Sequence, residues 1–161
     1  MRGNKRVLPC STLMNNQAST PAAPAWLQYL DHTADAGVIV QAATLEELFA
    51  RAAWAMFSML TDVAAIQPRL ARRVSVAAAD RQALLVRWLA ELNFLHVTRH
   101  EVYCRFDIES LSDTELVAEV HGEKVDLSRH LVYTEIKAVT FHGLQIEPTA
   151  GGWEAQVIFD L

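Results

Sequence analysis

The stretch Tyr29-Leu30-Asp31-His32-Thr33-Ala34-Asp35-Ala36-Gly37 separates two short apolar segments with a compact polar turn. The turn places Asp31, His32 and Asp35 within five residues. Oxygen and nitrogen donors packed this closely bind a divalent cation or form an acid/base pair. An aspartate in such a turn also closes an Asx turn on its own backbone, and for this pattern alone that is the commoner outcome. The turn by itself therefore leaves a functional and a structural interpretation open.

The other end of the chain supplies a third carboxylate. Residues 153–161 read Trp-Glu-Ala-Gln-Val-Ile-Phe-Asp-Leu, so a predicted final strand places Asp160 beside the terminal carboxylate of Leu161. Chain ends fray unless they are anchored, so a strand that runs to the last residue indicates an end with a defined position. Carboxylates gathered at one rim of a sheet would repel one another unless a cation or protons neutralised them.

Two helices are predicted from capping residues and apolar periodicity. Thr44-Leu45-Glu46-Glu47 is a capping box, in which we expect the Thr44 hydroxyl and the Glu47 side chain to satisfy each other's backbone N–H groups. The helix that follows carries one broad apolar face. Asp80 caps a second helix, whose leucines recur at helical spacing to about Thr98.

The remaining apolar segments read as strands. Seven of them have apolar or alternating residues, namely 26–30, 38–42, 70–76, 102–109, 115–120, 135–147 and 153–160. The segment 122–130 is polar and predicts a loop. This order indicates an α+β fold, a single two-layer domain in which two helices cover one face of a mostly antiparallel sheet.

Composition limits the classes of function. Residues 1–25 contain three basic residues and no acid, which leaves 11 basic and 19 acidic side chains in the rest of the chain. That balance disfavours strong direct binding to nucleic acid. Neither a membrane-spanning run nor a signal peptide is predicted, and two cysteines make no disulfide framework. We therefore expect a cytoplasmic protein, with residues 1–25 as a disordered N-terminal extension before one domain over residues 26–161.

With both termini placed, the pattern resembles the archease family. The segments that carry the resemblance occur in family order: Asp31-His32-Thr33-Ala34-Asp35, Thr44-Leu45-Glu46-Glu47, Gly122-Glu123-Lys124, Lys137-Ala138-Val139-Thr140-Phe141-His142, and Gly151-Gly152-Trp153 continuing to Phe159-Asp160-Leu161. They spread over essentially all of residues 26–161. The chain departs from the family at Phe141, where a tyrosine is common, and in the extension before Trp26.

The resemblance implies a metal-binding protein cofactor of the GTP-dependent tRNA-splicing and RNA-repair ligase, one that promotes guanylylation and multiple turnover of that ligase. It places the metal ligands on Asp35, Asp160 and Leu161, the last through its backbone or terminal oxygens. An all-oxygen set favours calcium, with magnesium or manganese as alternatives in function. His32, Lys137 and His142 lie in family segments and are weaker candidates for supporting roles.

Two other classes of function stay open from the sequence. A metal-dependent phosphoesterase would use Asp35 and Asp160 as ligands and His32 or His142 as general base. A chaperone-like interaction module would use the carboxylates only structurally. The sequence has no nucleophile in a recognisable turn, no glycine-rich phosphate loop and no zinc spacing, so we expect an activator that is not itself an enzyme.

Deletion of residues 1–25 should leave the melting temperature and ligase activation unchanged, because the segment lacks apolar periodicity and precedes the family pattern. Thermal melts and a ligase guanylylation assay on the truncated and full-length proteins test this. Unfolding of the truncated protein, or loss of activation, would assign the segment a role in the domain.

Overall fold

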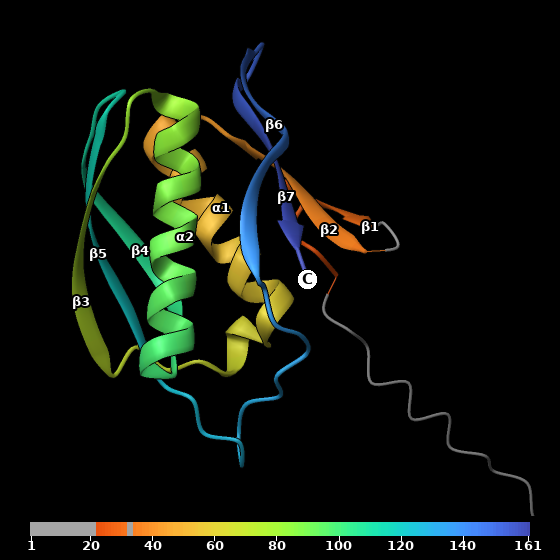
Figure 1. Ribbon diagram of the computed structural model, residues 1–161, viewed down its shortest axis with the longest axis vertical. Helices are drawn as coiled ribbons and strands as arrows, with labels where there is room; N and C mark the ends of the chain where they lie inside the picture. Colours follow the sequence, from red (N-terminus) through yellow and green to blue (C-terminus); the bar gives the residue numbers. More distant parts are fainter. Residues whose placement is uncertain (1–21, 32–33) are drawn as a thin grey trace, which may run out of the picture.

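The computed structural model describes residues 22–31 and 34–161 (Figure 1). The predicted extension, apart from residues 22–25, and the candidate His32 lie outside the described residues. The elements in chain order are β1 (Leu27–Asp31), β2 (Asp35–Ala42), α1 (Leu45–Leu60), a 3₁₀ turn (Val63–Ala65), β3 (Leu70–Ala77), α2 (Arg81–Arg99), β4 (Glu101–Leu111), β5 (Glu115–Lys124), β6 (Ala138–Thr149) and β7 (Gly152–Asp160).

The described strands form two antiparallel sheets, and the two helices lie between them (Figure 1). One sheet has the strand order β1-β2-β7-β6 and the other β3-β5-β4. The α+β class, the two helices and the antiparallel pairing are confirmed. The predicted arrangement of layers was wrong. The strands form two sheets with the helices between them, instead of one sheet with both helices on one face.

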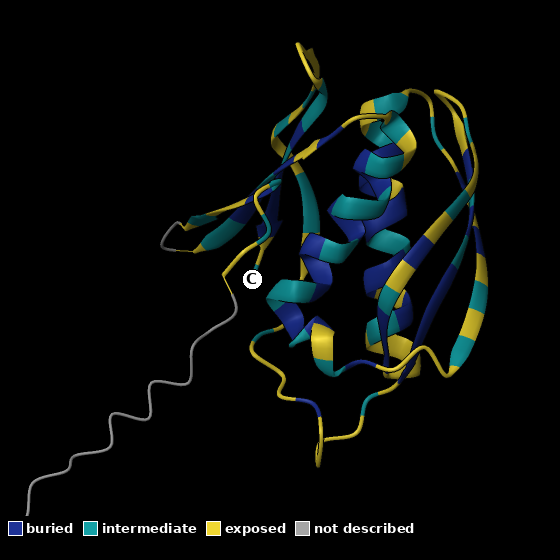
Figure 2. Ribbon diagram, turned by 180° about the vertical axis from the view of Figure 1, so that it is seen from behind, coloured by how far each residue is buried: buried dark blue, intermediate teal, exposed yellow. Residues whose placement is uncertain are grey.

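Helix α1 explains why two sheets are needed. Its buried residues lie on more than one side of the helix and include Ala55, Phe57 and Leu60, all with no exposed surface. A helix buried around most of its circumference must be covered on more than one side. Phe57 contacts the rings of Tyr103 and Phe106 on β4 at centroid distances of 5.5 and 5.8 Å, while other residues of α1 pack against β2 and β7. One core therefore joins both sheets to the helices (Figure 2).

Both predicted helix caps are present, with one difference in detail. The Thr44 hydroxyl accepts a hydrogen bond from the Glu47 N–H at 3.2 Å, and an Asp80 carboxylate oxygen accepts from the Ala83 N–H at 2.8 Å. The Glu47 carboxylate accepts from the N–H of Ala43 instead of that of Thr44. The cap thus fixes the chain one residue earlier than the capping-box pattern predicts.

Strand β5 is longer than predicted, because Gly122, Glu123 and Lys124 continue it instead of starting a loop. Gly122 lies opposite Tyr103 in the ladder, and a Cβ atom there would lie 1.8 Å from the carbonyl oxygen of Val102. Only glycine allows the strands to approach this closely. The alternation of apolar and polar residues over 115–120 does not extend through this polar segment. The strand predicted from the sequence is therefore shorter than the observed one.

Within the described ranges, neither helix is both long enough and apolar enough to cross a bilayer.

A buried ion pair holds the β3-β5-β4 sheet together near its end. Glu101 has no exposed surface, and its carboxylate accepts two hydrogen bonds from the Arg72 guanidinium and one from the Tyr103 hydroxyl. The Lys124 ammonium lies 3.5 Å from the same carboxylate. Hydrogen bonds from Arg72 lower the pKa of Glu101 to about 2, against the opposing effect of burial.

The substitution Glu101→Gln should lower the free energy of unfolding by about 3 kcal/mol, because it leaves Arg72 without its buried counter-charge. The control is Glu109→Gln, which removes a more exposed pair with Arg73 on the same sheet and should cost less than about 1 kcal/mol. Urea unfolding at neutral pH measures both variants. Equal losses would contradict a special role for the buried pair.

The same variant tests the pH dependence of stability. The folded pKa of Glu101 lies below its ordinary value of 4.5, so its contribution is complete above about pH 4.5 and is lost as the pH falls toward 2. Unfolding free energies of wild type and Glu101→Gln should therefore converge in acid.

Candidate metal site

The pairing of β2 with β7 brings the two predicted aspartate ligands together. In this antiparallel ladder Asp35 lies directly opposite Asp160. Residues in such positions have Cα atoms about 4.5–5.5 Å apart and side chains on the same face of the sheet. Two carboxylates from opposite ends of the domain are therefore cross-strand neighbours.

The register also shows which face the pair occupies. Val157 and Phe159 of β7 are fully buried against the core, and Val157 lies opposite the buried Val38. Side chains alternate along a strand, so Asp160 and its partner Asp35 lie on the face directed away from the helices. Asp160 is exposed and Asp35 is half-buried. The pair is thus accessible from outside the domain.

The next residues on β7 and β6 complete this end of the sheet. Leu161 packs its side chain against the core, which anchors the backbone next to Asp160. The Lys137 N–H donates a hydrogen bond to the Asp160 carbonyl oxygen at 2.8 Å, and Ala138 lies opposite Asp160. The Lys137 side chain is exposed. Asp35, Asp160, Leu161 and the backbone of Lys137 therefore meet at one sheet rim.

The structure does not bring His142 to this rim. It lies in the irregular segment of β6 between Thr140 and Gln145, four residues along the strand from Ala138. That separation corresponds to a distance on the order of 10 Å. The remaining histidine candidate, His32, precedes the described Asp35 by three residues and lies outside the described part of the chain.

The donor atoms at the rim suit a hard cation. Carboxylates of Asp35 and Asp160 and the backbone or terminal oxygens of Leu161 are the ligand types that calcium, magnesium and manganese prefer. Like charges directly opposite in a ladder destabilise the sheet. A bound divalent cation would remove that repulsion, so the residues present fit the cation that the family resemblance implies.

A second cluster of ligand types lies on the other sheet and was not predicted. The His121 Nε2 atom lies 2.9 Å from a Glu119 carboxylate oxygen and 3.2 Å from an Asp107 oxygen. The Arg105 guanidinium lies 3.0 Å from the same Nε2 and also contacts Asp107. Because Arg105 already supplies a positive charge at the centre, we interpret this cluster as an ion network.

The signal for this network in the sequence is weak. Its members alternate along two strands, so each strand alone shows only ordinary polar positions. Their proximity depends on the cross-strand pairing of Asp107 with Glu119 and of Arg105 with His121. The spacing of residues along the sequence does not show which side chains will be paired across neighbouring strands.

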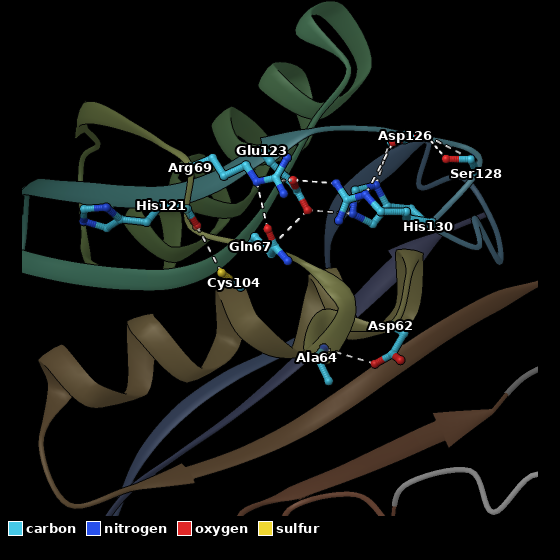
Figure 3. Close-up of polar contacts among 11 residues, drawn as sticks. Asp62, Ala64, Gln67, Arg69, Cys104, His121, Glu123, Asp126, Ser128 and His130 are labelled. Atoms are coloured by element: carbon cyan, nitrogen blue, oxygen red, sulfur yellow. Dashed lines mark hydrogen bonds and ion pairs between the residues drawn. The ribbon is translucent and has the colours of Figure 1, made fainter.

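The family segment Gly122-Glu123-Lys124 contains a buried carboxylate with a structural role (Figure 3). Glu123 accepts hydrogen bonds from the Gln67 N–H at 2.9 Å, from Arg129 at 2.7 Å and from the His130 ring at 2.9 Å. The Asp126 N–H donates to His130 Nδ1, so the proton of the neutral ring is on Nε2 and points at Glu123. Burial alone would raise the pKa of Glu123, but these hydrogen bonds outweigh it and lower the pKa to about 2.

Comparison with protein families gives one match that covers nearly the whole domain. The model of the archease protein family matches residues 27–161. Among curated relatives, a protein archease of Methanosarcina mazei is 39% identical over 138 residues, which are 83% of this chain and 94% of that protein. A protein archease of Thermococcus gammatolerans is 39% identical over 140 residues, 84% of this chain and 98% of its own.

Solved structures agree with these matches. The solution structure of Methanobacterium thermoautotrophicum protein 1598 superposes with a TM-score of 0.70 at 36% identity, covering 84% of this chain and 99% of that one. The crystal structure of a Thermotoga maritima archease, described as a possible chaperone, gives a TM-score of 0.56 at 19% identity, with coverage of 82% and 94%. The second likeness concerns the fold alone.

The substitution Asp35→Asn should raise the free energy of unfolding by up to about 1 kcal/mol in the absence of divalent metal, because it removes one of two opposed carboxylates. The gain should shrink at high ionic strength. Thermal melts in chelator at low and high salt measure both effects. Asp31→Asn is the control, since Asp31 lies opposite Ala36 and not opposite an acid. Equal shifts in the two variants would contradict repulsion across the ladder.

Proposed function

Because this chain belongs to the archease protein family, we propose that it is a metal-binding protein cofactor that activates the GTP-dependent tRNA-splicing and RNA-repair ligase. In this proposal it promotes guanylylation of the ligase and allows multiple turnover, acts in the cytoplasm and is not itself an enzyme. The role comes from the family resemblance. The observation that supports it in this chain is the pairing of Asp35 with Asp160 at an accessible sheet rim.

Each residue at the rim has a separate part in the proposal. The side chains of Asp35 and Asp160 hold the cation, and the oxygens of Leu161 complete the protein ligands. The core contact of Leu161 and the backbone hydrogen bond from Lys137 keep β7 in place at its last residues. A divalent cation presented there would supply positive charge for the phosphates of GTP.

The position of His142 removes one of the two histidines that a phosphoesterase at this rim would use as general base. A general base must lie within hydrogen-bonding reach of the water it activates, directly or through one further water. His142 is too far along β6 from Asp160 to serve a water bound at the carboxylate pair. His32, the other candidate base, lies outside the described residues, so the guanylylation assay decides between a presented cation and hydrolysis.

A guanylylation assay separates the three classes of function. Purified ligase is incubated with labelled GTP and metal, with and without this protein, and the covalent ligase–nucleotide product is measured over time. An increase in rate and turnover that needs both the protein and divalent metal supports the proposal. Hydrolysis of a phosphate ester by the protein alone would support the phosphoesterase, and a rise in soluble ligase without a change in rate would support a chaperone.

The substitution Asp160→Asn should weaken calcium affinity at least about tenfold and abolish most activation, because it removes charge while keeping size. A tag fused after Leu161 should have a similar effect, since it converts the terminal carboxylate into an amide. An N-terminal tag is the matched control and should change neither property. Calorimetric titration with calcium and manganese, beside the guanylylation assay, gives both readouts. Full activity of Asp160→Asn would exclude the metal role of this residue.

A further inference from the structure

The β1-β2-β7-β6 sheet has both helices on one side, and its other face is directed outward (Figure 1). Strand pairing orders the side chains of this outer face in four rows across the strands. Starting at the rim, the rows are Asp35, Asp160 and Ala138; then Leu30, Gly37, Ile158 and Thr140; then Gln28, Ile39, Gln156 and Gln145; and last Gln41, Glu154 and Glu147. The face thus has acids at both ends, with apolar and amide side chains between them.

The last row holds a second pair of opposed carboxylates. Glu147 of β6 lies directly opposite Glu154 of β7 in the antiparallel ladder. Glu147 is exposed and Glu154 is half-buried. The Gln41 Nε2 atom donates a hydrogen bond to a Glu154 carboxylate oxygen at 2.8 Å, but an amide brings no positive charge. Glu154 and Asp160 lie on the same strand, so the two acid pairs are separated by about 20 Å along β7.

The acids of this outer face have no positive partner. Within residues 22–31 and 34–161, no acid of the four rows takes part in an ion pair, and no row contains a lysine or arginine. The other sheet differs, because Arg73 lies 2.8 Å from Glu109 and Arg105 lies 3.1 Å from Asp107. Opposed like charges destabilise a ladder. Local costs of this kind are typical of functional surfaces.

The rows between the two acid pairs supply an apolar centre. The Ile158 side chain lies across Gly37, where a Cβ atom would be 2.6 Å from Ile158 Cδ1. Leu30 in the same row and Ile39 in the next row are half-buried. An apolar centre with a charged margin is the arrangement of protein–protein interfaces. A small bound ion would contact only one acid pair, whereas a protein partner can contact both pairs and the centre.

Charge decides which kind of partner fits this face. The carboxylates would repel RNA phosphates, and they would also repel the same face of a second copy of the chain. A protein surface that carries lysine or arginine is complementary to them. An enzyme that joins RNA ends carries such residues, because it must bind the phosphate backbone. The ligase of the proposed function therefore has the chemistry that the face requires.

We propose that the outer face of the β1-β2-β7-β6 sheet docks a basic surface of the ligase, with Glu147 and Glu154 bonding its lysine or arginine side chains. The inference rests on the proposed function for the identity of the partner. It adds the surface that binds and the charge that the partner presents. Since Glu154 and Asp160 lie on one strand, docking at the Glu147–Glu154 pair sets the distance between the ligase and the cation at the rim.

The test compares two charge reversals that change the net charge of the chain equally. Glu147→Lys alters the docking face, whereas Glu115→Lys alters an exposed acid of β5 that lies opposite Ala77 on the other sheet. At low salt, Glu147→Lys should weaken binding to purified ligase at least about tenfold, and Glu115→Lys less than about threefold. High salt should reduce the difference, because the contacts join exposed charges. Calorimetry or interferometry with immobilised ligase measures the affinities.

The same substitution controls for unfolding. Glu147→Lys places a lysine opposite Glu154, so it replaces repulsion across the ladder with attraction and should raise the melting temperature. Weaker binding by a more stable protein cannot come from unfolding. Glu147→Gln removes the charge without reversing it, and should lie between wild type and Glu147→Lys in affinity and in melting temperature. Equal affinities of Glu147→Lys and Glu115→Lys for the ligase would overturn the inference.

A second measurement needs no variant. In wild-type protein with labelled methyl groups, unlabelled ligase should shift the resonances of Ile39 and Ile158 and leave those of Val117 unchanged. Val117 lies between the buried Leu116 and Ala118 on β5, so its side chain is on the outer face of the other sheet. Shifts confined to Val117 and other surfaces would overturn the docking inference.

Two further outcomes would assign the face to another occupant. Loss of one bound calcium ion in Glu147→Gln, measured by calorimetry, would make the second acid pair a cation site. Shifts of the Ile39 methyl resonances on deletion of residues 1–25, which contain three basic residues and no acid, would assign the face to this segment of the chain itself. Either result would overturn the inference.

The outcomes separate this inference from the proposed function. Stimulated guanylylation by wild type, together with equal binding of the two lysine variants, would refute the docking face and leave the function intact. Selective loss of binding in Glu147→Lys, without any gain in guanylylation by wild type, would support the docking face and refute the activator role.

Discussion

The antiparallel pairing of β2 with β7 is the constraint on which the rest of the structure depends. It joins the start of the domain to its last strand and aligns Val38 with Val157, so that both lie in the core. In the same register Asp35 lies opposite Asp160 on the outer face. A slip of one residue would move every side chain of the strand to the other face, turning the aspartates into the core and the valines out. Burial of the apolar residues therefore sets the position of the acids.

Helix α1 is the second organising element, because it lies between the sheets and contributes to one continuous core. Its contacts with β2 and β7 support the sheet that carries the carboxylate pair, and its contact through Phe57 supports β4. The end of α1 also holds the 125–136 loop through Thr61 and Leu60. The rim and the 125–136 loop are thus fixed relative to the same helix.

Buried ionised groups stabilise the parts of the structure that apolar packing alone does not hold. Glu101 joins β3 to β4 through Arg72, and Glu123 joins β5 to the 125–136 loop through His130. Both carboxylates have pKa values lowered to about 2, since each accepts several hydrogen bonds in its charged form. Such groups specify one arrangement, because any alternative would leave a buried charge without partners.

The sequence by itself determined the local structure of this protein and the family to which it belongs. The caps at Thr44 and Asp80 and the apolar periodicity are short-range signals, so the helices and most strands were predicted close to their observed bounds. The motif segments were enough to name Asp35 and Asp160 as candidates. Their proximity was an expectation that followed from the family resemblance.

Tertiary structure decided the features that depend on contacts between distant segments. The division into two sheets follows from the burial of α1 on more than one side, and the separation of His142 from the rim follows from the irregular pairing of β6 with β7. The partners of Glu101 and the Arg105–His121 network arise in the same way. Each depends on register and packing between elements, and residue spacing along one chain does not encode which strands will be neighbours.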